Sequence, residues 1–236
     1  MKIVLSLILT LAVVLHLSRD PVLDGLAGDL SMGYVVRYSG DGGDADRLPM
    51  LIALHGNGDS AAGFHETDLS GVKEACRIVL LKGPLSHGGG DAWPWTFEDL
   101  ERYGPALDEA AGRLTGEFPT KGKPVLLGFS GSGTMAYYQA LRHGGRYSLV
   151  VPVSGSLAMG APGTPGSASG TKVIAFHGKS DGVIPFIEGD LATQTLEGDG
   201  LDVTFNEFNG DHLAFFRSMN ATILGVVDGG LRSVAH

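Results

Sequence analysis

A serine stands in a tight, glycine-rich turn between an apolar run and a segment with a helical pattern. Ser130 directly follows the run Val125–Phe129, and Gly131, Ser132 and Gly133 come after it. This context is typical of a nucleophile elbow, a strained strand-to-helix turn that exposes a serine hydroxyl above a sheet. A strict G-x-S-x-G motif has glycine where Ser132 stands, so an ordinary turn or a phosphate loop is the alternative. No G-x-x-x-x-G-K-[ST] pattern supports the phosphate loop.

Two residues further along the chain match the partners that such a serine requires. Asp181 follows the apolar run Lys172–Phe176, and His212 follows Val203–Phe208. Taken singly, an aspartate before glycine is usually a turn residue, and a lone histidine is usually a surface residue. The order serine, acid, histidine is that of hydrolytic triads on α/β sheets. It predicts Ser130 as nucleophile, His212 as general base and Asp181 as the carboxylate that orients the imidazole.

The loop after the run Met50–Leu54 contains a His-Gly-Asn-Gly sequence. A loop there faces the serine turn, so we expect the backbone N–H groups of Asn57 and Gly131 to form an oxyanion hole. His55 is expected to shape this loop rather than to perform chemistry.

A glycine-rich segment with two tryptophans, residues 88–97, lies between the oxyanion loop and the serine turn in the sequence. Aromatic side chains often line ligand pockets, so Trp93 and Trp95 are predicted to bind substrate. The alternative is that both rings only pack this loop onto the domain.

The residues between these motifs predict the elements that position them. Short apolar runs alternate with longer helix-compatible stretches, which indicates a mostly parallel sheet covered by helices on both faces, an α/β fold. In such sheets, ligands bind beyond the carboxyl ends of the strands, where all of these motifs lie. The expected strands are Tyr34–Tyr38, Met50–Leu54, Arg77–Leu81, Val125–Phe129, Ser148–Val153, Lys172–Phe176 and Val203–Phe208. The expected helices are Phe97–Glu117, Thr134–Arg142, Ile187–Leu196 and His212–Val227.

With these motifs in place, the chain resembles the phospholipase/carboxylesterase family of α/β-hydrolases, which includes the acyl-protein thioesterases. The matching segments are Leu54–Ser60, Trp93–Trp95, Leu127–Ala136, Pro152–Leu157, Ile174–Pro185 and Asn209–His212. The resemblance implies an α/β-hydrolase fold and hydrolysis of a small-molecule ester, thioester or lysophospholipid, with no cofactor and no metal. The family usually has Gln-Gly-Gly after the nucleophile, where this chain has Gly131-Ser132-Gly133, and the residues after His212, Leu-Ala-Phe-Phe, are more apolar than the family pattern.

Composition excludes several other classes of protein. The 236 residues carry a net charge of -9 with no basic block, which speaks against nucleic acid as a partner. The single Cys76 excludes an intrachain disulfide and a multi-cysteine metal site. Two alternatives stay open: polyester or peptide hydrolysis by the same residues, and a catalytically inactive α/β-hydrolase scaffold that binds a partner. A metal site built from His55, His177, Asp181 and His212 lacks a ligand-spacing motif.

The first residues indicate export. Lys2 precedes an uncharged apolar run over 3–17, long enough for a signal peptide but short for a membrane span of about 20 residues. Residues 1–20 are therefore predicted to be a signal peptide or an uncleaved membrane anchor, with a buried first element as the alternative. Residues 28–236 are expected to form a single α/β-hydrolase domain, with residues 156–170 as a long surface loop.

Overall fold

The computed structural model describes residues 25–27, 32–157 and 170–235. The predicted signal peptide or anchor over residues 1–20, and residues 158–169 of the predicted surface loop, lie outside these ranges, so both stay predictions. Within the described ranges, no helix is long and apolar enough to cross a membrane.

The described part of the chain is organised around an eight-stranded sheet with the strand order β1-β2-β4-β3-β7-β8-β9-β10. The strands are β1 (Gly25–Ala27), β2 (Met32–Ser39), β3 (Met50–Leu54), β4 (Cys76–Leu81), β7 (Val125–Phe129), β8 (Leu149–Val153), β9 (Lys172–Gly178) and β10 (Asp202–Phe208). In this sheet the pairs β1–β2 and β2–β4 are antiparallel. The remaining pairs, β4–β3, β3–β7, β7–β8, β8–β9 and β9–β10, are parallel. The predicted mostly parallel α/β architecture is therefore confirmed.

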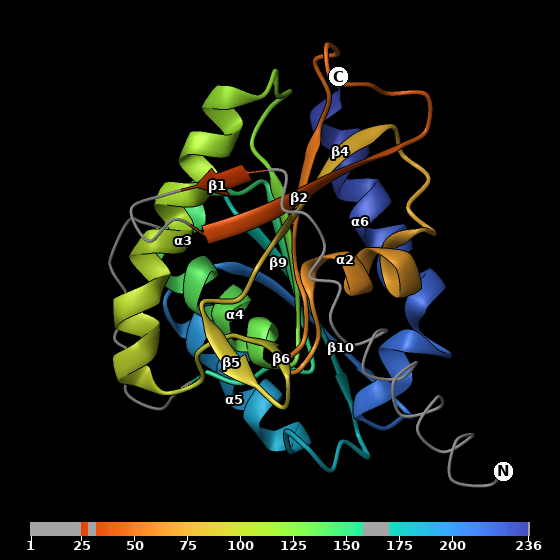
Figure 1. Ribbon diagram of the computed structural model, residues 1–236. Helices are drawn as coiled ribbons and strands as arrows, with labels where there is room; N and C mark the ends of the chain where they lie inside the picture. Colours follow the sequence, from red (N-terminus) through yellow and green to blue (C-terminus); the bar gives the residue numbers. More distant parts are fainter. Residues whose placement is uncertain (1–24, 28–31, 158–169, 236) are drawn as a thin grey trace, which may run out of the picture.

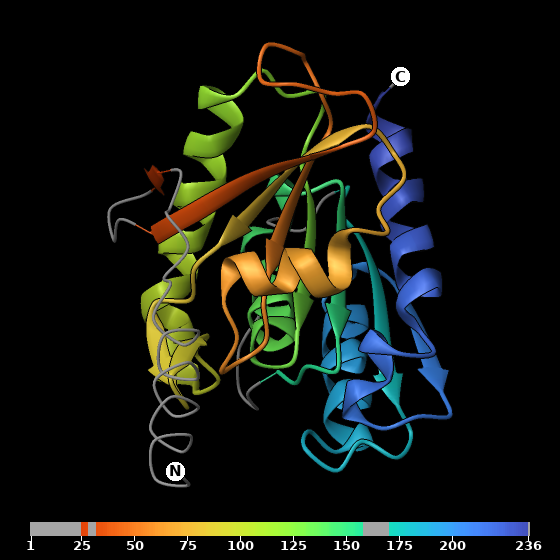
Figure 2. The same cartoon turned by 45° about the vertical axis from the view of Figure 1, so that its right-hand side comes forward.

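Helices cover both faces of this sheet (Figure 1). One face carries α3 (Phe97–Glu117), α4 (Gly131–His143) and α5 (Phe186–Gly198), and the other carries α2 (Ala61–Phe64) and α6 (Asn220–Ala235). Figure 2 brings α2 in front of the strands, with α3 and α6 on either side. Three short segments complete the description: the π-helix η1 (His65–Leu69) and the 3-10 turns η2 (Gly144–Arg146) and η3 (His212–Phe216).

The strands are continuously apolar because both faces of the sheet are buried. In β3 every side chain is inaccessible to solvent, and successive residues enter different cores. Met50, Ile52 and Leu54 pack under α3, α4 and α5, whereas Leu51 and Ala53 pack under α2 and α6. This alternation fixes the strand register, since a shift by one residue would exchange the two sets.

Three features differ from the sequence prediction. Helix α4 begins at Gly131 rather than Thr134, because the serine turn leads into it without a linker. The predicted helix over His212–Val227 is interrupted: η3 ends where Arg217 has φ −124° and ψ −94°, and α6 starts only at Asn220. A hairpin of β5 (Leu85–His87) and β6 (Gly90–Ala92) was not expected, and its turn uses positive φ at Gly88 and Gly89.

Two exposed glycines in α6 offer a test of local stability. A Cβ added at Gly225 or Gly229 would meet no atom within 4 Å. Replacing either glycine by alanine is expected to raise the free energy of unfolding by about 0.5–1 kcal/mol, because glycine carries a larger entropy cost in a helix. Gly104→Ala in α3 is the control. It is expected to lower the free energy of unfolding, because the added Cβ would lie 2.1 Å from Cε1 of Tyr138. Urea unfolding of the three variants checks this, and a loss of stability at Gly225 or Gly229 would contradict it.

Candidate active site

The turn between β7 and α4 holds Ser130 in a strained backbone conformation. Ser130 has φ 61° and ψ −121°, a region that residues with a side chain rarely adopt. The turn closes because its neighbours are glycines: a Cβ at Gly128 would lie 2.3 Å from the Ser132 carbonyl oxygen, and one at Gly133 would lie 2.6 Å from the Val153 oxygen. The N–H of Ser130 donates to that same Val153 carbonyl at 2.9 Å. The geometry is that of a nucleophile elbow, as the sequence predicted.

Ser132 explains the departure from the strict motif. Its side chain is fully buried, and its Oγ accepts a hydrogen bond from the Phe129 N–H at 2.9 Å. The same hydroxyl lies 2.7 Å from the carbonyl oxygen of Leu54, to which it donates. Ser132 therefore ties the serine turn to the end of β3, and a glycine at this position would leave these two backbone groups without that link.

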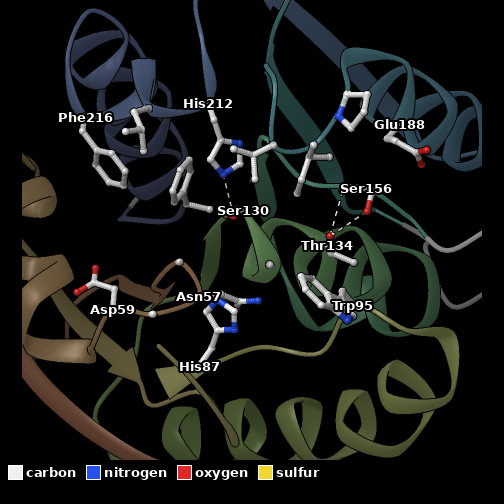
Figure 3. A pocket seen from close by; sticks show the side chains of 18 residues that line it. Asn57, Asp59, His87, Trp95, Ser130, Thr134, Ser156, Glu188, His212 and Phe216 are labelled. Carbon is white, nitrogen blue, oxygen red and sulfur yellow. Dashed lines mark hydrogen bonds between the residues drawn. The ribbon is translucent and has the colours of Figure 1, made fainter. Parts of the chain in front are cut away.

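The three residues predicted from chain order come together in one hydrogen-bonded chain. His212 Nε2 lies 2.9 Å from Ser130 Oγ, and His212 Nδ1 lies 2.7 Å from Asp181 Oδ2 (Figure 3 draws the first of these bonds). They meet because β7, β9 and β10 are parallel, so that the loops after them leave the same edge of the sheet. With the imidazole proton on Nδ1, the histidine donates to Asp181 and accepts from the Ser130 hydroxyl.

Asp181 is held in its ionised form. Burial by itself would raise the pKa of this carboxyl, but hydrogen bonds from His212 and from two backbone N–H groups outweigh it and lower the pKa below the usual value. Its Oδ1 accepts from the N–H groups of Val183 and Ile184, each at 2.9 Å. The second carboxylate oxygen is thereby left to face His212.

Two other histidines near the site have structural contacts. His55 lies inside the domain, where its Nδ1 is 2.7 Å from the Gly56 carbonyl oxygen and its Nε2 accepts from the Gly83 N–H at 3.1 Å. His177, on β9, has Nε2 at 2.9 Å from the Ile184 carbonyl oxygen and so closes the loop that carries Asp181. The expectation that His55 shapes its loop agrees with these contacts.

These buried histidines predict a pH dependence of stability. Burial lowers the pKa of both His55 and His177, so the folded protein keeps them neutral while the unfolded chain binds protons below about pH 6.5. Their contribution is fully present above that pH and is lost as the pH falls below it. The free energy of unfolding is expected to fall between pH 7 and 5, by at most about 1.4 kcal/mol per pH unit for each group. Urea unfolding across this pH range measures the effect. His177→Asn should reduce the slope of the free energy of unfolding against pH, whereas His87→Asn, at an exposed position, should leave it unchanged. A free energy of unfolding that does not vary with pH would contradict the prediction.

The residues predicted as oxyanion donors flank the serine. Asn57 and Gly131 both line the cavity that contains Ser130 and His212. Asn57 lies in the loop after β3, and Gly131 is the first residue of α4. In Figure 3, Ser130 lies between His212 on one side and Asn57 on the other. The N-terminus of α4, next to Ser130, also favours negative charge at this point.

The cavity above Ser130 has a volume of about 760 Å³. The described residues of its wall are mostly apolar or uncharged, and neither lysine nor arginine is among them. The lining residues are Gly56, Asn57, Gly58, Asp59, His87, Trp95, Phe129, Ser130, Gly131, Thr134, Ser156, Val183, Ile184, Pro185, Glu188, His212, Leu213 and Phe216. Such a space accommodates a small organic molecule with an apolar part.

The two tryptophans have different positions. Trp95 lines the cavity and is 63% exposed, so it is available to a substrate. Trp93 is 1% exposed, packs against the His55 ring at a centroid distance of 5.8 Å and belongs to the core beneath α3 and α4. The prediction of a substrate contact by Trp93 is therefore not supported: its ring fills the domain interior and does not line the cavity.

The sequence interpretation missed the apolar side of the cavity. Phe216 packs edge-on against Phe129, with 4.6 Å between the ring centroids. The Phe129 ring centroid in turn lies 5.0 Å from that of His212. Leu213 and Phe216 both line the cavity, whereas Phe215 is buried. The sequence signal for this apolar side was the run of apolar residues after His212. It was missed because the predicted helix over His212–Val227 would have spread these side chains around its axis.

The described residues offer neither a metal site nor a reactive thiol. Among residues 25–27, 32–157 and 170–235, no group of three or more His, Cys, Asp or Glu side chains could hold a metal ion. The thiol of Cys76 is buried in β4, and burial raises its pKa to about 12. It is therefore a neutral core residue at physiological pH.

The sheet order, the strained serine turn and the three loops that meet above it are those of an α/β-hydrolase fold. The model of the phospholipase/carboxylesterase family matches residues 118–223, a segment that includes Ser130, Asp181 and His212. This match covers less than half of the chain, and it agrees with the resemblance that the sequence motifs indicated. None of the curated proteins compared by sequence matches this chain.

Solved structures with the same fold include esterases and a thioesterase. The chain is similar to a carboxylesterase from Bacillus cereus, with a TM-score of 0.69 and 16% identity over 86% of this chain and 96% of that chain. It is also similar to acyl-protein thioesterase 2 from Zea mays, with a TM-score of 0.63 and 21% identity over 84% of this chain and 98% of that chain. At these identities the likeness shows the fold alone.

Proposed function

We propose that this protein hydrolyses small or medium acyl esters through a serine nucleophile and an acyl-enzyme. The observation that carries the proposal is the hydrogen-bonded chain Ser130–His212–Asp181, whose serine opens into a cavity of about 760 Å³. A serine hydroxyl bonded to an imidazole that is itself oriented by a carboxylate is the arrangement that activates a serine for attack on a carbonyl.

The proposed reaction follows from the contacts. Ser130 Oγ attacks the ester carbonyl while His212 Nε2 accepts its proton, and Asp181 stabilises the imidazolium that forms. The N–H groups of Asn57 and Gly131 hold the negative oxygen of the tetrahedral intermediate. His212 then gives its proton to the leaving alcohol or thiol, and water activated by His212 hydrolyses the acyl-enzyme.

The cavity wall favours neutral substrates. Its apolar side, which includes Trp95 and Phe216, suits an acyl chain, and its charged groups are the carboxylates of Asp59 and Glu188. Because none of the described residues that line the cavity is a lysine or arginine, we propose neutral acyl esters or thioesters rather than substrates with a phosphate or carboxylate beside the scissile bond. Lysophospholipids, polyesters and peptides are the alternative substrates for the same residues.

A panel of p-nitrophenyl esters of increasing acyl length tests the acyl site. Trp95→Ala is expected to lower kcat/KM for the longer chains about tenfold more than for the acetate, because the ring offers apolar contact in the cavity. Trp93→Ala is expected to lower stability by about 3–5 kcal/mol while leaving the chain-length profile of the folded fraction unchanged. An unchanged profile in Trp95→Ala would exclude that ring from the acyl site. Intact-mass detection of a fluorophosphonate adduct separates an enzyme from an inactive scaffold.

A further inference from the structure

The side chain of Asn57 connects the loop after β3 to the tryptophan segment. Its Oδ1 accepts from the Trp93 N–H at 2.7 Å, and its Nδ2 lies 3.4 Å from the Trp93 carbonyl oxygen, to which it donates. At the next residue of this loop, the Gly58 N–H donates to the Asp91 carbonyl oxygen at 2.8 Å. One amide side chain thus satisfies both backbone groups of Trp93, two residues before Trp95 in the cavity wall.

The same side chain occupies the space above Gly131. A Cβ added at Gly131 would lie 2.4 Å from Oδ1, 2.6 Å from Cγ and 2.6 Å from Nδ2 of Asn57. Contacts under 3.0 Å require one of the groups to move, and the amide of Asn57 is held by its bonds to Trp93. The family that this chain resembles usually has glutamine after the nucleophile. Here the residue after Ser130 has no side chain, and Asn57 fills the corresponding space from the opposite loop.

We infer that Asn57 and Gly131 form a coupled pair in which the Asn57 side chain is a positioning residue that sets the spacing of the oxyanion donors. The inference rests on the proposed function, because the two donors are the backbone N–H groups of these same residues. A Cβ at position 131 would push the Asn57 amide away from the helix N-terminus. The backbone N–H of Asn57 would then move away from the oxyanion of the intermediate, which it must hold within about 3 Å.

A double-mutant cycle tests the coupling on a neutral p-nitrophenyl ester. Gly131→Ala is expected to lower kcat about 100-fold, the size of the loss of one oxyanion donor, with little change in KM. Asn57→Ala keeps its backbone N–H and is expected to lower kcat only about tenfold. The kcat of the double variant should be at least about tenfold higher than that of Gly131→Ala. The Cβ of residue 131 then occupies the space that the Asn57 amide has left.

Two further variants separate positioning from general structure. Asn57→Asp keeps the oxygen that accepts from Trp93, so it is expected to retain more activity than Asn57→Ala. Gly225→Ala, at an exposed site on α6, is expected to match the wild type in kcat and KM. Thermal unfolding of every variant shows whether the loss of kcat follows loss of folded protein.

The outcomes are distinct. Additive losses in the cycle, or wild-type kcat in Gly131→Ala, would overturn the coupling. Equal activity of Asn57→Ala and Asn57→Asp, together with a fall in kcat that matches the folded fraction, would reduce Asn57 to a structural residue. A folded wild type that gives neither ester turnover nor a fluorophosphonate adduct would instead refute the proposed function, and with it the oxyanion role of the pair.

Discussion

Replacing Ser130 by alanine is expected to lower kcat for ester hydrolysis by at least about 10⁴-fold and to abolish the fluorophosphonate adduct. In the proposed mechanism the oxygen of this hydroxyl forms the acyl-enzyme, and no neighbouring group in the described site replaces it. The Cys76 thiol is buried and neutral, and Ser132 is buried with its hydroxyl bonded to Phe129 and Leu54. Intact mass after labelling, with kcat on p-nitrophenyl butyrate, measures both effects.

The control removes a different serine hydroxyl close to the site. Ser180→Ala changes an exposed side chain next to Asp181 whose backbone N–H, which donates to the Gly210 carbonyl oxygen, is retained. It is expected to keep one adduct and wild-type turnover. An adduct that persists in folded Ser130→Ala would place the nucleophile elsewhere, and no adduct on folded wild type would favour the inactive binding scaffold.

Replacing Asp181 by asparagine is expected to lower kcat about 10³- to 10⁴-fold while the protein stays folded. Asparagine can keep the oxygen that accepts from the N–H groups of Val183 and Ile184. Its NH₂ group would then face His212 Nδ1, at the position where Asp181 Oδ2 now lies 2.7 Å away. Since Nδ1 must accept from that NH₂ group, the imidazole proton moves to Nε2, which can no longer take the proton of Ser130.

Asp211→Asn is the matched control, because Asp211 is adjacent to His212 in the sequence but faces solvent. Its carboxylate oxygen caps η3 by accepting from the Leu213 N–H at 3.0 Å, a bond that asparagine can also make. It is expected to stay within about threefold of wild-type kcat. Far-UV circular dichroism and thermal unfolding establish that both variants are folded. Activity of Asp181→Asn within about tenfold of the wild type would mean that the carboxylate does not govern the tautomer.

The chemistry-bearing residues could be found from the sequence because their order and local context are constrained. Ser130 needs small neighbours and a strand before it, and Asp181 and His212 each follow an apolar run, so all three were expected at strand ends. The parallel pairing of β7, β8, β9 and β10 then brings these ends to one edge. The roles assigned to the three residues await the experiments above.

The sequence predicted less well wherever packing between distant segments decided the outcome. Trp93 and Trp95 are two residues apart with the same ring, yet one is 1% and the other 63% exposed. Nothing local distinguishes them, because Trp93 is buried by contact with His55 and by its backbone bonds to Asn57. The break after η3 has the same origin: Phe215 and Phe216 turn toward Phe129 instead of continuing a helix.

The sequence by itself therefore determined the alternation of strands and helices, the serine turn, and the order of the residues that could act with it. These depend on local sterics and on apolar periodicity, which a single chain displays directly. Only the tertiary structure decided which tryptophan faces the cavity, which apolar residues line it, and why glycine follows the serine. These depend on atoms brought together by loops far apart in sequence, such as the amide of Asn57 above the Cα of Gly131.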